Sequence, residues 1–459
     1  MATPSPDPTA PRFARLRHVA RGLQLDRAVL YILVLRLWQL LAGPVTVLLI
    51  VRYFSPEMQG FYYAFGSLLA FQTLFDLNVT VVLLVGAGRE WIALDLDSHG
   101  RVTGESTAAE QLASLARFGT VWYRGAAALC LLFVGGAGFL IFRQQGLGAS
   151  DQLAWGVTIL AASLILTLLP RMAILQGCHQ ILAVNRNLAL QSICGSLVVW
   201  TCLVVGLGLW AVPCAWLVRL GWDVWLVHGR FGPLFASLRH RTAHAINWKA
   251  DLWPLQWRLA VQSIASAVAT ASFVLSLFIM HSEAAAGRIG MTFSVLHMLL
   301  WGGLAWLQTR VPKLSGLAKH EERGQYDRLF IRITLLTTAA VLSGALAGWF
   351  VILGLDYFDI HVGEVRLADR FVSPISFALM AIAIIAQHII NCLTTYSRTR
   401  QREAFVLPNV ILNGGLTAGI WLAAGPYGEF GVALVAATAL VVGGLPIWLM
   451  IWRRERRTW

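Results

Sequence analysis

Apolar runs of about 20 residues recur along the whole chain and constrain its fold more than any other feature. A helix that spans a bilayer needs about 20 mostly apolar residues. Twelve such runs occur in the 459 residues: 28–51, 60–86, 119–142, 153–175, 188–206, 211–228, 257–280, 288–309, 329–354, 372–395, 405–424 and 431–451. They leave no stretch long enough for a soluble domain. We therefore predict an all-α polytopic membrane protein with about twelve transmembrane helices.

The composition supports this prediction and limits the partners. Hydrophobic residues make up 57% of the chain and charged residues 13%, whereas a soluble domain has about 45–50% and about 25%. The formal net charge of +13 is by itself typical of nucleic-acid binding. With so little polar surface, however, a soluble enzyme or nucleic-acid binder is excluded.

The positive charges predict the orientation of the chain in the membrane. With the N-terminus inside, the cytoplasmic segments hold 25 Lys and Arg residues and the external segments hold 5. Such an excess marks the cytoplasmic side. An even number of spans places both termini there, and we expect a multi-pass membrane protein with both termini in the cytoplasm. The external connections are short, which argues against an enzyme that polymerises sugars on the outer face.

Weak internal matches divide the chain into two halves. The entries to the third and ninth runs align Phe118 with Phe330, an offset of 212, and Cys178 and Cys392 align at an offset of 214. Repeated halves are common in transporters. We predict a cytoplasmic tail (1–27), a six-helix half (28–228), a basic cytoplasmic linker (229–256), a second six-helix half (257–452) and a basic tail (453–459).

Ionisable residues inside spans are costly and are functional candidates by default. Arg36 and Asp76 lie at similar depths, roughly 12–15 Å from the cytoplasmic end of their spans at ~1.5 Å per residue, so an ion pair between the first two helices is expected. Arg219 and Asp223 are four residues apart and share a helix face. Each pair is interpreted either as structural or as a substrate cation beside a titrating carboxylate.

The other intramembrane ionisable groups have two interpretations each. Long side chains near the cytoplasmic boundary can extend their charged ends into the membrane interface. This interpretation applies to Arg124, Arg258 and Arg332. For Arg171, this interpretation and a substrate contact are equally good. His297 and His388 are either packed core histidines or proton relays. Amides add hydrogen-bonding capacity for neighbouring helices or for sugar hydroxyls: Gln39, Gln72, Asn78, Gln191, Gln262, Gln387, Asn391, Asn409 and Asn413.

Catalytic signatures are missing from the sequence. There is no Walker-type glycine loop, no metal-ligand spacing and no nucleophile–base arrangement. We therefore predict that the chain is not an enzyme, uses no cofactor or metal, and does not hydrolyse ATP.

Two segments carry a family resemblance. The stretch RYFSPEMQGFYY (52–63) resembles the first external turn of polysaccharide and O-antigen flippases of the multidrug/oligosaccharidyl-lipid/polysaccharide (MOP) exporter superfamily, and residues 290–313 are similar to the matching part of the second half. Twelve spans rather than fourteen favour the O-antigen type over the peptidoglycan-precursor type.

The resemblance implies a helical bundle that moves an undecaprenyl-pyrophosphate-linked glycan across the inner membrane, with a cationic cavity and an ion gradient. Carried over to this sequence, it makes Arg36 and Arg219 cavity cations, with Arg124, Arg171 and Arg258 as further substrate candidates. Asp76, Asp223, His297 and His388 become ion-coupling candidates. The implied partners are the lipid-linked glycan, membrane lipids and glycosyltransferases or a polymerase of the same pathway. The alternatives are an ion-coupled drug antiporter of the same superfamily and a non-transport component of a glycan-assembly complex.

Overall fold

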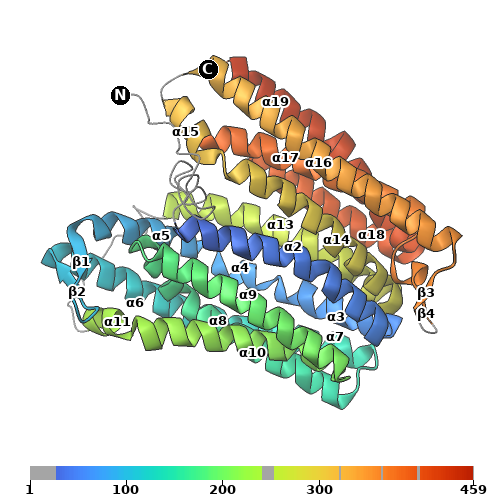
Figure 1. Cartoon of the computed structure of the whole chain (residues 1–459), viewed down its shortest axis with the longest axis horizontal. Helices are drawn as coiled ribbons and strands as arrows, with labels where there is room; N and C mark the ends of the chain where they lie inside the picture. The colour runs from blue at the N-terminus through green and yellow to red at the C-terminus, as the bar shows by residue number, and fades with distance from the viewer. Residues whose placement is uncertain (1–26, 240–252, 320–321, 363–364, 401–403, 458–459) are drawn as a thin grey trace, which may run out of the picture.

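The computed structural model describes residues 27–239, 253–319, 322–362, 365–400 and 404–457, and they form a helical bundle in two groups (Figure 1). Among these residues, nine helices are long and apolar enough to cross a membrane, and ten if one bent pair counts as a span. The polytopic all-α prediction is therefore confirmed.

The first group runs from α2 to α11 and is coloured blue to green in Figure 1. Its elements are α2 (Arg27–Tyr53), α3 (Pro56–Leu69), α4 (Gln72–Asp76), α5 (Val79–Glu90), η1 (Trp91–Ala93), β1 (Leu94–Leu96), β2 (Val102–Gly104), α6 (Ser106–Leu129), the π-turn η2 (Cys130–Val134), α7 (Gly135–Gln144), α8 (Ala149–Gly177), α9 (Ile181–Val204), η3 (Gly208–Trp210), α10 (Ala211–Val224), the π-turn η4 (Trp225–Arg230) and α11 (Gly232–Arg239). Strands β1 and β2 pair antiparallel, with Asp95 opposite Thr103. Helix α2 packs along α9, and α8 contacts α5, α6 and α10.

The second group is coloured yellow to red. Its elements are α13 (Trp253–Met280), α14 (Glu283–Gln308), α15 (Val311–Lys319), α16 (Arg323–Tyr357), β3 (His361–Val362), β4 (Val365–Arg366), η5 (Ala368–Arg370), α17 (Pro374–Thr399), α18 (Val406–Thr438), the π-turn η6 (Ala439–Gly444) and α19 (Leu445–Arg457). Helix α13 packs along α18, and α17 contacts α16 and α18. Residues 240–252 of the basic linker lie outside the described residues, whereas its first part forms α11 and its last residues begin α13.

The long segment Val406–Arg457 is a helical hairpin. Gly428 has φ 53° and ψ −140°, which interrupts the helix. A Cβ on Gly419 would meet Val435, and one on Gly444 would meet Leu412, so the two legs run antiparallel. This segment supplies both the eleventh and twelfth apolar runs, and α10 with η4 supplies the sixth.

The second apolar run, 60–86, is not one straight helix. It is divided into α3, α4 and α5. The segment Pro56–Asp76, which contains α3 and α4, is bent by 48° relative to Val79–Ala93, which begins with α5. Leu77 and Asn78 both have positive φ, 47° and 56°, a conformation that Asn tolerates better than most residues. The side chain of Asn78 crosses to the other group and donates to the Ser263 hydroxyl at 2.8 Å.

The two groups meet through a small set of helices. Helix α3 packs along α14 and also touches α13, while α4 contacts α13 and α2 contacts α14. The N-terminus of α2 and the C-terminus of α19 lie at the same end of the bundle as α11 and α15 (Figure 1). We call this the basic end, and the end with α3, β3 and β4 the closed end.

Candidate functional site

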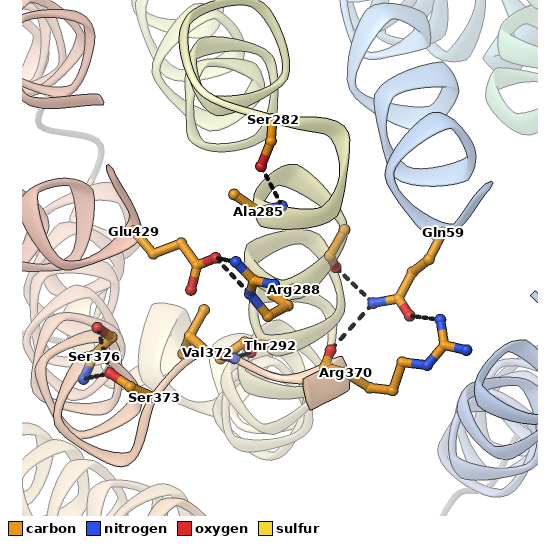
Figure 2. A network of polar contacts seen from close by, with 11 residues as sticks. Gln59, Ser282, Ala285, Arg288, Thr292, Arg370, Val372, Ser373, Ser376 and Glu429 are labelled. Atoms are coloured by element: carbon orange, nitrogen blue, oxygen red, sulfur yellow. Dashed lines mark hydrogen bonds and ion pairs between the residues drawn. The ribbon is translucent and has the colours of Figure 1, made fainter. Parts of the chain in front are cut away.

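At the closed end, Gln59 of α3 joins the two groups of helices. Its side chain is 1% exposed, and its amide nitrogen donates to the carbonyls of Gly287 at 2.8 Å and Arg370 at 3.2 Å. Figure 2 shows this amide between α14 and the loop after β4. A buried amide that satisfies carbonyls on two segments fixes their separation, because an unpaired buried polar group costs about 1–3 kcal/mol.

Glycines let α3 and α14 approach closely beside Gln59. A Cβ on Gly60 would lie 2.6 Å from the carbonyl carbon of Glu283, and a Cβ on Gly287 would lie 2.9 Å from the nitrogen of Gly60. Small residues at helix interfaces are typical of membrane bundles, where close packing replaces the hydrophobic driving force. This contact seals the closed end.

Two arginines at the same end were not singled out by the sequence analysis. Arg370 is 1% exposed, and it donates to the Gln59 amide oxygen at 3.5 Å and to the Phe54 carbonyl. Arg288 of α14 binds Glu429, in the turn of the hairpin, at 2.5 Å and 2.6 Å (Figure 2). Both arginines lie at the ends of apolar runs, where an arginine side chain is usually expected to be exposed, and for this reason the sequence did not mark them.

The loop that carries Arg370 is itself held by charges. Arg366 binds Asp356 at 3.2 Å, Asp359 at 2.5 Å and Asp369 at 3.6 Å. The hydrogen bond to Asp359 is the largest cause that raises the pKa of Arg366 above its ordinary value. Exposed pairs contribute little singly, but three acids around one guanidinium define the conformation of this loop.

A pocket of about 500 Å³ lies among α2, α9 and α10, and we call it the N-half pocket. Arg219 and Trp216 line it, with the guanidinium 5.2 Å from the indole ring centre. Arg219 is 4.0 Å from Asp223, as the four-residue spacing predicted. The Asp223 carboxylate is buried and also accepts from Asn187 at 3.1 Å and from Gln191.

Arg36 reaches the N-half pocket through a neighbour. Its guanidinium donates to Gln39 at 3.2 Å, and Gln39 lines the pocket together with Arg219. Arg36 is exposed. Of the two arginines that were expected to be cavity cations, Arg219 lines this pocket, whereas Arg36 does not line it and contacts the lining residue Gln39.

The expected ion pair between Arg36 and Asp76 does not form. Asp76 instead accepts from the Tyr123 hydroxyl and from Thr80, the latter at 3.1 Å and 3.3 Å. The depth argument assumed one regular helix, but Asp76 ends α4 just before the left-handed Leu77. The break turns the carboxylate toward α6.

The second group has its own pocket of about 270 Å³, which we call the C-half pocket. Its walls come from α13, α14, α17 and α18. They include five of the amides noted in the sequence, Gln262, Gln387, Asn391, Asn409 and Asn413. His297 also lines it, stacked on Phe293 with ring centres 3.7 Å apart. Among the described residues, no carboxylate lines either this pocket or the N-half pocket.

His388 lies outside the C-half pocket. It is fully buried, and its Nε2 is 3.0 Å from the Thr337 hydroxyl and 3.5 Å from the Cys392 sulfur. This environment is that of a packed core histidine, one of the two interpretations of the sequence.

Arg124 and Arg171 line a third pocket of about 470 Å³, near the basic end and among α6, α8, η4 and α11. We call it the basic pocket. It shares no lining residue with the N-half pocket, so these arginines do not join Arg36 and Arg219 in one cavity. Arg258 belongs to α13, and its side chain lies outside the described part of the chain.

Comparisons with known proteins identify the fold. No protein-family model and no curated protein sequence matches the chain. A structure titled as the inward-facing conformation of a multidrug resistance MATE family transporter of the MOP superfamily matches with a TM-score of 0.67, 12% identity, and coverage of 94% of this chain and 100% of the other. The lipid II flippase MurJ, in an inward closed conformation, matches with a TM-score of 0.63 and 12% identity over 92% of this chain and 87% of the other. A mutant of the Vibrio cholerae MATE transporter VcmN matches with 0.54, 13% identity, and coverage of 96% and 98%. The chain therefore has the fold of MOP-superfamily transporters.

Proposed function

We propose that this protein is an alternating-access transporter that moves a lipid-linked, phosphate-bearing oligosaccharide across a bacterial inner membrane. The observation that carries the proposal is the chemistry of the two pockets. Arg219 lines the N-half pocket, and Arg36 lies next to it, bonded to the lining residue Gln39. A guanidinium pairs with phosphate oxygens through two parallel hydrogen bonds. The fold, which is that of MOP transporters, is compatible with this function.

The C-half pocket suits the sugar part of such a substrate. Its amides both donate and accept hydrogen bonds, as sugar hydroxyls do, and they lie beside the aromatic rings of Phe293 and Trp301. A pyrophosphate bound near Arg219 and a glycan among the amides would engage both halves of the bundle.

Asp223 is our first candidate for ion coupling. Its carboxylate is buried behind Arg219 and satisfied by two amides. A substrate phosphate that attracts Arg219 weakens the Arg219–Asp223 pair, and a less stabilised carboxylate takes up a proton more readily. Asp76, bonded to Tyr123, is a second candidate, and His297 in the C-half pocket is a third.

A drug antiporter of the same superfamily is the second candidate function. The similarity in fold to multidrug MATE transporters favours it. Recognition of a cationic drug would place carboxylates in the pocket walls, and the walls described here present arginine and amides instead. Asp223 would have to lose its amide partners to serve that purpose.

Mass spectrometry of lipids that co-purify with the protein tests the proposal. We expect a prenyl-phosphate glycan to be enriched with the wild-type protein and lost from Arg219→Gln. Arg332→Gln is the matched control, because Arg332 is an exposed arginine of α16 that lines neither pocket. Enrichment that is equal in both variants, or bound cationic drug in place of glycolipid, would contradict the proposal. Co-purification of glycosyltransferases without transport in vesicles would instead indicate an assembly component.

A further inference from the structure

The basic pocket carries chemistry that the proposed transport pathway does not use. Its walls include four arginines and one histidine: Arg117, Arg124, Arg171, Arg239 and His228. No carboxylate lines it among the described residues. Arg124 and Arg171 carry like charges in this pocket and repel each other, so an anion between them would be stabilised.

Contacts within the basic pocket position these groups. Arg171 lies 2.9 Å from the Nε2 of His228, and its guanidinium is 5.9 Å from the ring centre of Phe235. Arg117 donates to the carbonyl of Arg239 at 3.5 Å. A guanidinium has five N–H donors. The hydrogen bond to His228 and the contact with the Phe235 ring do not use all of them, so Arg171 can also donate to an anion in the pocket.

The pocket lies at the depth of lipid headgroups. Arg143, in the last turn of α7, and Arg124 of α6 belong to one continuous rod. The 19 residues between them correspond to about 29 Å at ~1.5 Å per residue, close to the roughly 30 Å hydrocarbon core. With Arg143 at one interface, Arg124 lies at the other, at the basic end. Basic pockets between helices on the cytoplasmic side typically bind anionic headgroups.

The rim of the basic pocket continues into an exposed strip on α6. Val121 lines the pocket and is 71% exposed. Along the same face of the rod, Gly125, Ala128 and Leu132 follow at helical spacing and are exposed. An acyl chain attached to a headgroup in the pocket would lie along this strip, whereas a soluble anion would gain nothing from it.

We propose that the basic pocket binds the phosphate headgroup of an anionic membrane phospholipid, with Arg124 and Arg171 as its main ligands. The site lies within the first group of helices, away from the α3–α14 contact between the groups. It does not depend on the identity of the transported substrate. A lipid bound there would join α6, α8 and α11 at the membrane surface.

Native mass spectrometry of the full-length protein tests this site. We expect wild-type protein to bind cardiolipin or phosphatidylglycerol at least tenfold more tightly than phosphatidylcholine, and the double variant Arg124→Gln/Arg171→Gln to lose that preference. Arg332→Gln should keep it. Equal affinity for phosphatidylcholine, or the same loss in Arg332→Gln, would overturn the proposal.

Two measurements keep the test decisive if the double variant folds poorly. Arg124→Lys/Arg171→Lys preserves both charges and should retain a preference for anionic lipid, although a weaker one because lysine lacks the planar fork. Millimolar inorganic phosphate should not displace the lipid from wild-type protein. Displacement by phosphate alone would show a soluble-anion site and refute the lipid assignment.

Discussion

Replacement of Gly60 by alanine should open the closed end. The added Cβ would lie 2.6 Å from the carbonyl carbon of Glu283, whereas ordinary contacts begin at 3.4 Å. Helices α3 and α14 must therefore separate by at least about 0.8 Å, taking 3.4 Å as the contact limit for packed heavy atoms, because the carbonyl oxygen of Glu283 lies closer still to the added Cβ. The same shift stretches the bond from Gln59 to Gly287, now 2.8 Å, to at least about 3.6 Å, which is no longer a hydrogen bond.

The energetic cost follows from these distances. Overpacking a close interface costs about 1–3 kcal/mol, and each hydrogen bond lost adds about 1 kcal/mol. The closed arrangement is thus disfavoured by roughly 2–4 kcal/mol, which corresponds to at least about a 30-fold shift in a two-state equilibrium. Such a shift is enough to repopulate a transporter whose two states differ by a few kcal/mol.

Distance measurements between spin labels check this prediction. Labels at Leu207 and Tyr427, 48% and 69% exposed, report on opposite groups at the closed end when the six native cysteines are replaced. We expect longer distances in Gly60→Ala. Gly66→Ala on the same helix is the control, since a Cβ there meets nothing within 4 Å. Unchanged distances in Gly60→Ala, or equal changes in the control, would refute the reasoning.

Three further perturbations have defined outcomes. Asp223→Leu should lower the unfolding temperature in detergent, mainly because it leaves the two buried amides of Asn187 and Gln191 without their acceptor, at a cost of roughly 3 kcal/mol; unchanged stability would contradict this account. Asn413→Leu should weaken retention of a co-purified glycolipid by roughly fivefold, equivalent to about 1 kcal/mol for one hydrogen bond, without changing the unfolding temperature. Gly428→Ala should destabilise the hairpin by about 1–3 kcal/mol, because φ is 53° there and the Cβ would lie 3.1 Å from His281. Gly425→Ala, with its nearest contact at 3.6 Å, should leave the unfolding temperature close to that of the wild type.

The fold was predictable because the bilayer constrains it strongly. A membrane span requires a long apolar run, and these runs are visible without any tertiary information. The break at Leu77 and Asn78 was not predictable, because the apolar pattern continues through it. Two contacts stabilise the break: Asn78 donates to Ser263 of the other group, and the Tyr123 hydroxyl donates to Asp76. Both contacts depend on tertiary packing.

The site was predictable where it depends on spacing within one helix. Arg219 and Asp223 pair as their four-residue separation predicted. Sequence could not show that Arg124 and Arg171 belong to a different pocket, because depth along a span does not tell which side of a helix faces which neighbour. The burial of Arg370 was missed for a related reason: it lies in a short loop, and loop residues carry no periodic pattern.

In the alternating-access function that we propose, the placement of the pockets lets one bundle serve both membrane faces. The N-half and C-half pockets are each enclosed almost entirely by helices of one group, so a relative rotation of the groups need not disturb the Arg219–Asp223 pair or the cluster of amides. What must change is the contact of α3 with α14. That contact combines the close approach of glycines and a few hydrogen bonds with apolar packing, as where Phe61 of α3 lies against Phe278 of α13. In a bilayer, apolar surfaces gain little by associating with each other instead of with lipid. A close-packed contact of this kind can therefore be strong when aligned and can separate without a large hydrophobic penalty, as the proposed alternating-access gate requires.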